Sequence, residues 1–219
     1  MRFLCFHGKG TNAKIFKQQT EKIRHALGPE HEFVFVDGPL SVKAMKLALD
    51  DQNSQDDVEQ YLSFDVFNVE QFEGLYRDLN KYIKLSGPFN GVMGFSEGAT
   101  LAASMIFRQE LQLRPDDFKC AVFLSSITPL SIHASVKGEL RFLSESIDGT
   151  LINLPTAHIW SDADTTPPGV GNVLADLCCP DSRHIVQHSV GHEVPGSYSD
   201  QGLMESVRAI ERVIEMAKS

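Results

Sequence analysis

The segment from Gly91 to Thr100 has the residue types of a serine nucleophile held on a sharp turn. Its centre reads Gly94-Phe95-Ser96-Glu97-Gly98, with a glycine two positions away on each side of the serine. An apolar run precedes this pattern and a helix-forming run follows it. In a strand–turn–helix of this kind, the glycines let strand and helix approach closely, and the turn lifts the hydroxyl out of the sheet. The context favours a nucleophile over an incidental serine in a glycine-rich turn.

A serine hydroxyl becomes a good nucleophile only when a base accepts its proton and a third group orients that base. In such folds the acid and then the histidine follow the serine along the chain, each after a later strand. His192, in Gly191-His192-Glu193, has the position expected of the base. Two carboxylates, Asp162 and Asp164, follow the apolar run 157–160. The residues alone leave both as candidates for the acid.

The negative charge formed by acyl transfer needs two converging N–H donors. One is the backbone N–H of Glu97, and the glycine-rich segment from His7 to Asn12 supplies the other, which we expect to be that of Lys9. A dinucleotide-binding loop is the alternative for this segment, but residue 13 is alanine where that motif requires its third glycine. No His, Asp or Glu cluster has metal-ligand spacing, so we expect neither a metal nor a cofactor.

Short apolar runs alternate along the chain with segments of helical period, which is typical of a parallel sheet covered by helices on both faces. We expect one helix from Asn12 to about Leu27, and further helices with apolar stripes over 72–83 and 203–214. The sequence predicts about six strands, at Arg2–His7, Glu32–Val36, Gly91–Phe95, Cys120–Leu124, Ala157–Trp160 and His184–His188. Each proposed catalytic residue then lies at the carboxyl end of a strand, where open α/β sheets place their sites.

Length and charge restrict the class of protein. The chain has 219 residues, which predicts a single domain spanning 1–219. Its formal net charge of −9 argues against a protein whose whole surface binds nucleic acid or an anionic membrane. No run approaches 18 apolar residues, and the first residues lack the apolar core of a signal peptide. We expect a cytoplasmic protein with no membrane span.

Residues 38–67 fit the alternation of strands and helices least well. Six acidic residues lie here, and apolar residues are few before Phe64. A long connection of this kind is a mobile surface loop or a lid over a site. The aromatic residues at its end, Phe64 and Phe67, are candidate substrate contacts together with His7, and the stretch from Leu130 to Leu143 is a further candidate wall of an apolar acyl pocket.

Together these motifs resemble the FSH family of serine hydrolases, small α/β-hydrolases that include fungal polyketide-releasing thioesterases. The resemblance covers nearly the whole chain. It rests on His7-Gly8 after the first strand, Phe35-Val36-Asp37-Gly38-Pro39, the segment Gly94 to Ala99, the segment His158 to Asp164, and Gly191-His192-Glu193-Val194-Pro195. The chain departs from the family pattern at Ser161, where the family has glycine, and at Glu97, where glutamine is common.

The resemblance implies that Ser96 is the nucleophile, Asp164 the acid and His192 the base. It implies hydrolysis of an ester or thioester through an acyl-enzyme, with an acyl or polyketide chain as the acid portion. A general short-chain carboxylesterase, transfer of the acyl group to another acceptor, and a non-catalytic binding protein on a hydrolase scaffold remain alternatives. An acidic acyl carrier protein is a candidate partner for the basic segment with Lys9, Lys14, Lys17, Lys22 and Arg24, although a solvated helix face explains the same charges.

Overall fold

A six-stranded sheet forms the centre of the computed structural model, which describes residues 1–42, 60–112, 118–131, 141–166 and 171–219. Every neighbouring pair of its strands is parallel, in the order β2-β1-β5-β6-β7-β8. The strands are β1 (Arg2–Phe6), β2 (Glu32–Val36), β5 (Gly91–Phe95), β6 (Cys120–Leu124), β7 (Thr156–Ser161) and β8 (Arg183–His188). The predicted fold class and the six predicted strands are confirmed.

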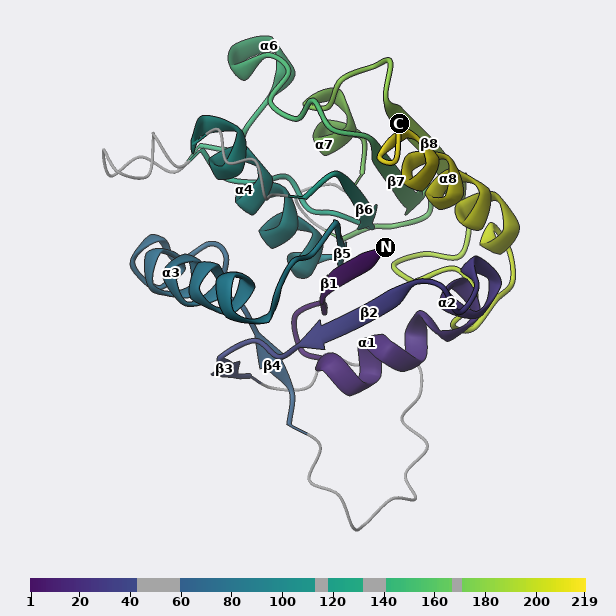
Figure 1. Cartoon of the computed structure of the whole chain (residues 1–219), viewed down its shortest axis with the longest axis horizontal. Coiled ribbons are helices and arrows are strands. Elements are labelled where there is room, and N and C mark those ends of the chain that lie inside the picture. The colour runs from purple at the N-terminus through teal and green to yellow at the C-terminus, as the bar shows by residue number, and fades with distance from the viewer. Residues whose placement is uncertain (43–59, 113–117, 132–140, 167–170) are drawn as a thin grey trace.

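Helices cover both faces of this sheet (Figure 1). On one face, α1 (Ala13–Gln19), α2 (Glu21–Leu27) and α8 (Leu203–Met216) contribute to one apolar cluster. On the other face, α3 (Val69–Ser86), α4 (Glu97–Gln112) and the short α7 (Asn172–Asp176) contribute to a second cluster. A single helical turn, α6 (Glu145–Asp148), lies in the connection between β6 and β7.

Side chains of the central strands alternate between the two apolar clusters. In β1, Leu4 and Phe6 pack under α3 and α4, whereas Phe3 and Cys5 pack under α1, α2 and α8. None of these four side chains has exposed surface. Burial on both faces is the reason that these strands read as continuous apolar runs, without the polar alternation of a half-exposed strand.

Two helices occupy the residues where the sequence predicts one, from Asn12 to about Leu27. Asn12 caps α1 as expected, because its side-chain oxygen accepts the N–H of Ile15 at 2.8 Å. The helix is interrupted at Thr20, whose hydroxyl donates to the carbonyl oxygen of Phe16 at 2.8 Å. A β-branched residue that bonds back to the preceding turn in this way favours a bend. The end of α2 at Leu27 agrees with the prediction.

Residues 43–59, most of the predicted loop or lid, lie outside the described residues, and so do residues 132–140 of the predicted acyl-pocket stretch. The described ends of the first segment form a small antiparallel sheet of β3 (Leu40–Ser41) and β4 (Leu62–Ser63). β4 also pairs with the loop after β1: Gly10 N–H donates to Leu62 O at 2.9 Å, and Leu62 N–H donates to Thr11 O at 2.8 Å. A lid role for 38–67 remains a prediction.

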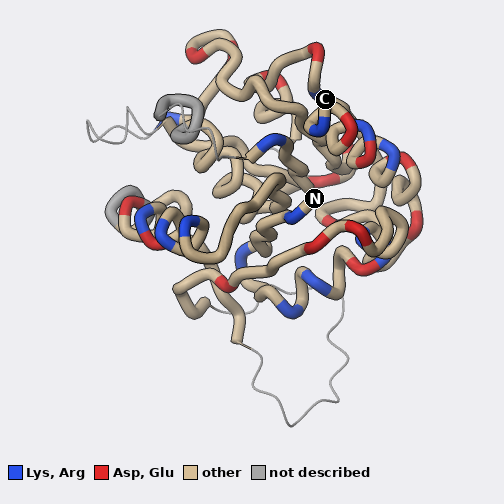
Figure 2. Tube along the Cα trace, in the orientation of Figure 1, with Lys and Arg blue, Asp and Glu red and all other residues tan. Residues whose placement is uncertain are grey.

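Acidic and basic residues are mixed along the chain trace, with basic residues in α1 and α3 (Figure 2). Among the described helices, none combines the length and the apolar character needed to cross a membrane. Because all six strands run in one direction, the loops that follow them emerge at a single edge of the sheet. The proposed catalytic residues Ser96, Asp164 and His192 all lie in or directly after these loops.

Candidate active site

Ser96 lies on a strained turn between β5 and α4. Its φ angle is 53°, in the left-handed region that non-glycine residues rarely adopt. A Cβ atom at Gly94 would collide with the backbone of Gly98, and one at Gly98 would collide with the carbonyl oxygen of Phe6 in β1. The two glycines are therefore required by the close approach of strand and helix. Strain of this kind, held in place by its surroundings, is common at active sites.

His192 and Asp164 are brought together although they lie 28 residues apart. The Nδ1 atom of His192 lies 2.5 Å from Oδ2 of Asp164, whose side chain has no exposed surface. Burial raises the pKa of Asp164, but hydrogen bonds from His192 and from the N–H of Thr166 outweigh it, so the pKa is lowered overall. The carboxylate is thus suited to remain ionised and to hold a proton on Nδ1 of the ring.

The other ring nitrogen of His192, Nε2, is buried and has no hydrogen-bond partner among the described residues. The ring packs against that of Phe95, the residue before Ser96, with 5.0 Å between the ring centroids. No hydrogen bond joins Ser96 to His192 in this structure, and catalytic hydrogen bonds often tighten only in the complex with substrate. The arrangement leaves Nε2 without a partner on a ring that packs against the residue before the proposed nucleophile.

Asp162, the alternative acid, is exposed, and its backbone N–H donates to the carbonyl oxygen of His188. Its neighbour Ser161 has a role that the sequence did not indicate. The buried hydroxyl oxygen of Ser161 accepts the N–H of Ala163 at 3.1 Å and the N–H of Gly191 at 2.9 Å. One side chain therefore joins the loop that carries Asp164 to the loop that carries His192.

The two expected oxyanion donors are present as unsatisfied backbone groups. Within the described residues, neither the N–H of Lys9 nor that of Glu97 has a hydrogen-bond acceptor. Glu97 begins α4, and the first N–H groups of a helix lack partners within the helix. Lys9 lies between Gly8 and Gly10 in the loop after β1. Among the described residues both N–H groups thus lack an acceptor, and their role as oxyanion donors remains a prediction.

The side chain of Glu97 is buried, with 1% of its surface exposed. Its carboxylate accepts the hydroxyl of Ser63 at 2.9 and 3.0 Å and the N–H of Phe64 at 3.0 Å. Burial raises the pKa of Glu97, although these hydrogen bonds and the ammonium of Lys9 partly oppose the shift. Sequence reasoning did not find this contact, because Ser63 follows the acidic connection and has no motif of its own.

The three candidate substrate contacts differ in their surroundings. His7 has no exposed surface: Nε2 accepts the N–H of Gly38 at 2.9 Å, and Nδ1 donates to the carbonyl oxygen of Gly8 at 2.8 Å. Burial lowers the pKa of His7, in keeping with a neutral ring. Phe64 is buried against the His7 ring, with centroids 4.7 Å apart. Both residues support the loops around Ser96, and a direct substrate contact by either remains a prediction.

Phe67 differs from these two residues because it is partly exposed, at 37%. It makes an edge-on contact with Phe142, itself 44% exposed, with 6.3 Å between ring centroids. The pair joins the connection before α3 to the connection after β6. No three His, Cys, Asp or Glu residues are grouped so as to hold a metal ion in the part of the chain that the structure describes.

Comparison with known proteins identifies a family. A family model described as "Serine hydrolase (FSH1)" matches residues 1–204. "Esterase FPY3" of Fusarium mangiferae is 34% identical, over 99% of this chain and 98% of that protein. "Esterase OVCA2" of Danio rerio is 28% identical, over 91% of this chain and 92% of that protein. These alignments extend over nearly the whole length of this chain and of each relative.

Solved structures with the same fold include Arabidopsis thaliana SOBER1, with a TM-score of 0.56 and 14% identity over 98% of this chain and 99% of that one. A Bacillus cereus carboxylesterase matches with a TM-score of 0.52 and 16% identity, over 97% of this chain and 87% of that one. At such identities the likeness is one of fold. The expected α/β-hydrolase architecture is confirmed.

Proposed function

Since this chain belongs to the FSH1 serine hydrolase family, we propose that it cleaves esters or thioesters through a covalent acyl-enzyme with Ser96 as nucleophile. Relatives that align over nearly the whole chain are named esterases, which supports the reaction class. The positive φ angle of Ser96 supports its role, because the strained turn presents the hydroxyl at the carboxyl edge of the sheet.

In the first half of the proposed reaction, the Ser96 hydroxyl oxygen attacks the acyl carbon, and Nε2 of His192 accepts the proton. Asp164 holds the ring in the tautomer that leaves Nε2 free, and stabilises the imidazolium that forms. The N–H groups of Lys9 and Glu97 bind the oxyanion of the tetrahedral intermediate. The imidazolium then gives its proton to the leaving alcohol or thiol as the bond to the acyl carbon breaks.

In the second half, His192 accepts a proton from water, and the hydroxide attacks the acyl group on Ser96. Collapse of the second tetrahedral intermediate releases the carboxylic acid and returns the proton to the serine oxygen. If another alcohol or amine takes the place of water, the same intermediate gives acyl transfer. All proton transfers are carried by this one histidine, which therefore alternates between base and acid.

A single observation carries this proposal. Nδ1 of His192 lies 2.5 Å from the buried carboxylate of Asp164, while Nε2 has no partner among the described residues and the ring packs against Phe95, the residue before Ser96. His158, His184 and His188 also each have one buried ring nitrogen without a partner among the described residues, so the bond from Nδ1 to a buried carboxylate is the feature that distinguishes His192.

Covalent labelling tests the proposal. A fluorophosphonate probe should label the folded protein, and the Ser96→Ala variant should lose both labelling and hydrolysis of p-nitrophenyl butyrate. If the folded protein is not labelled and has no hydrolytic activity, it is a binding protein on a hydrolase scaffold. If the Ser96→Ala variant keeps full activity, another group is the nucleophile and the proposal is wrong.

For the substrate, we propose a medium to long apolar acyl chain, including a polyketide chain held as a thioester. The exposed pair Phe67 and Phe142 supports an apolar acyl group. The alternative is a general short-chain carboxylesterase. Values of kcat/KM for oxygen esters and thioesters of matched chain length distinguish the two, and preference for an acetate ester over every thioester would overturn the polyketide assignment.

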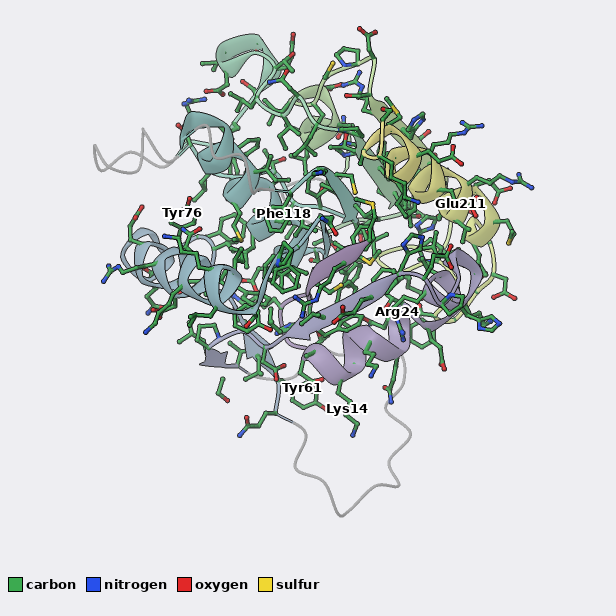
Figure 3. The ribbon with its side chains drawn as sticks, in the orientation of Figure 1. Lys14, Arg24, Tyr61, Tyr76, Phe118 and Glu211 are labelled. Atoms are coloured by element: carbon green, nitrogen blue, oxygen red, sulfur yellow. The ribbon has the colours of Figure 1, made fainter. Side chains whose placement is uncertain are left out.

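As the partner that delivers a thioester, we propose an acidic acyl carrier protein. Support comes from Lys9, Lys14 and Lys17, which are exposed in and after the loop with the proposed oxyanion donor (Lys14 is labelled in Figure 3). Of the other basic residues of this segment, Lys22 lies 2.6 Å from Asp200, and Arg24 donates to the Lys17 carbonyl oxygen at 2.7 Å. The proposed docking face is centred on α1, where Lys14 and Lys17 are exposed.

The Lys17→Glu variant tests the carrier. It should raise KM for an acyl group on an acidic carrier protein and leave KM unchanged for the same acyl group on N-acetylcysteamine. Equal effects on both substrates would overturn the carrier assignment and leave the esterase reaction intact. A cytoplasmic location remains a prediction, which microscopy of the tagged protein in its source cells would test.

A further inference from the structure

The carboxylate of Glu97 is not used by the reaction proposed above, which requires only the backbone N–H of this residue. The side chain is nevertheless buried and accepts hydrogen bonds from the Ser63 hydroxyl and the Phe64 N–H. Burial of a carboxylate is costly unless hydrogen bonds compensate it. The buried and hydrogen-bonded side chain of Glu97, directly after the proposed nucleophile, therefore needs a role other than the backbone N–H.

The segment that Glu97 holds is itself bonded to the loop with the second oxyanion donor. Leu62 precedes Ser63 in β4, and it exchanges two backbone hydrogen bonds with Gly10 and Thr11, of 2.9 and 2.8 Å. The ring of Phe64 packs against His7, at the other end of the same loop. Hydrogen bonds therefore connect the residue after the nucleophile to the residues that follow Lys9, and ring packing connects it to His7 before Lys9.

The turn that follows β4 strengthens this connection. The Ser63 oxygen that donates its proton to Glu97 also accepts the N–H of Asp65 at 3.0 Å. Asp65 has a φ angle of 51°, so the chain turns sharply directly after the bonded residues. Glu97 thus contacts a folded turn with its own internal hydrogen bond, and such a turn can transmit a restraint.

We propose that the Glu97 side chain is a positioning group which, through Ser63, Phe64 and Leu62, fixes the Lys9 N–H relative to the Glu97 N–H. This inference rests on the proposed function, because it assumes that these two groups form the oxyanion hole. Lys9 has a glycine on each side, and glycine restrains the backbone least, so the loop needs restraint from outside. Preorganised donors stabilise an oxyanion best when they need not move during the reaction.

Three variants test the inference. Glu97→Ala removes all the acceptor atoms, Ser63→Ala removes the hydroxyl and keeps the carboxylate, and Glu97→Gln keeps the shape and one acceptor oxygen. We expect Glu97→Ala to lower kcat about 10- to 100-fold with little change in KM, since displacement of one donor weakens binding of the transition state. Ser63→Ala should lower kcat in the same direction, and Glu97→Gln should restore most of it.

The affinity for a compound that forms a tetrahedral adduct with the serine is a second measurement. A general loss of stability would not change this affinity. Phenylboronic acid forms such an adduct with a catalytic serine, so its affinity should fall in parallel with kcat in Glu97→Ala. Ser206→Ala is the matched control: it removes a buried hydroxyl that donates to the Gly202 carbonyl oxygen in α8. This control should leave kcat and boronate affinity unchanged.

The double variant Ser63→Ala/Glu97→Ala should be no slower than Glu97→Ala alone, because both changes break the same path. The inference is wrong if Glu97→Ala keeps the kcat of the wild-type protein, or if Glu97→Gln is as slow as Glu97→Ala. Should Glu97→Ala fail to fold, Ser63→Ala with wild-type kcat and boronate affinity would overturn it. Failure of the proposed function is a separate result, seen as full activity of the Ser96→Ala variant.

Discussion

The hydroxyl oxygen of Ser161 lies 2.9 Å from the backbone nitrogen of Gly191 and accepts its hydrogen bond. The same oxygen accepts the N–H of Ala163, so it connects the two loops whose residues Asp164 and His192 are in contact. Ser161 ends β7, and the strand fixes its position. Asp164 and His192 are therefore held together by their own hydrogen bond and also by Ser161, which is fixed at the end of β7.

Substitution of Ser161 tests this support. We expect Ser161→Ala to lower kcat about fivefold, because a lost buried hydrogen bond is worth about 1 kcal/mol and the two loops can then separate. Steady-state kinetics with p-nitrophenyl butyrate measures the effect. Ser189→Ala, which removes an exposed hydroxyl bonded to Gln201, is the control and should behave as the wild-type protein. Equal kcat values for the two variants would contradict the prediction.

The identity of the acid can be tested with a pair of isosteric substitutions. Asp164→Asn should lower kcat about 10³- to 10⁴-fold, because the amide favours the wrong tautomer of His192 and leaves the imidazolium without its counter-charge. Asp162→Asn should retain kcat close to that of the wild-type protein, since its side chain is exposed. Comparable losses in the two variants would mean that the acid is wrongly assigned.

The buried carboxylate of Glu97 predicts a specific dependence of stability on pH. Its pKa is raised in the folded protein, chiefly by burial, so the folded state binds the proton more tightly than the unfolded chain. The stabilisation from this proton is fully present below the unfolded pKa of about 4.3 and is lost as the pH rises through the folded pKa. Lys9 is the charged group that opposes the shift.

We therefore expect the free energy of unfolding of Glu97→Gln to increase relative to that of the wild-type protein between pH 4 and neutral pH, because only the wild type loses the stabilising proton. Urea unfolding at several pH values measures the difference. Glu211→Gln, on the exposed side of α8 (Figure 3), controls for the loss of one negative charge. A difference that stays constant with pH, or changes in the opposite direction, would contradict the prediction.

Two substitutions of glycine by alanine are predicted to change the stability of the folded protein in opposite directions. Gly98→Ala should destabilise the fold by about 1–3 kcal/mol or more, because the new methyl group meets the carbonyl oxygen of Phe6, which belongs to a central strand. Gly74→Ala, in α3, meets nothing within 4 Å and should stabilise the helix by up to about 1 kcal/mol. Thermal unfolding measures both, and equal melting temperatures would show that the turn tolerates a side chain.

The exposed aromatic pair predicts how the enzyme depends on acyl chain length. Phe67→Ala should raise KM for p-nitrophenyl octanoate several-fold and leave KM for the acetate unchanged, because only the longer chain buries apolar surface on the ring. The control is Leu85→Ala, an apolar residue that is 76% exposed near the end of α3. If the ratio of the two KM values is unchanged in Phe67→Ala, the pair does not contact the acyl group.

The sequence predicts the central sheet well because its strands are buried on both faces and read as uninterrupted apolar runs. Positions after neighbouring strands also predict contact between His192 and either Asp162 or Asp164, and the resemblance to the family selects Asp164, which makes the contact. It does not predict the break at Thr20, where one hydroxyl competes for a carbonyl oxygen within a helical pattern. The β3–β4 pair is missed for another reason. Each strand has two residues, which is too few for an alternation of polar and apolar residues to be recognised in the sequence.

The contacts of Ser63 and Ser161 are also missed, and both are serine hydroxyls bonded to distant segments. Such bonds depend on how loops from different strands meet, and serine is common enough in loops that its presence carries little information. Motifs therefore locate the groups that react, whereas the groups that hold them in place become visible only in three dimensions.

The order of the strands has a consequence for how substrate preference could change in relatives of this protein. After β1 the chain moves outward to β2, and after β5 it proceeds in the opposite direction to β6, β7 and β8. In open α/β sheets, ligands bind at the point where the strand order reverses, which here lies between the turn with Lys9 and the turn with Glu97. Insertions after β6 or β7 would change the surroundings of this point without displacing either turn.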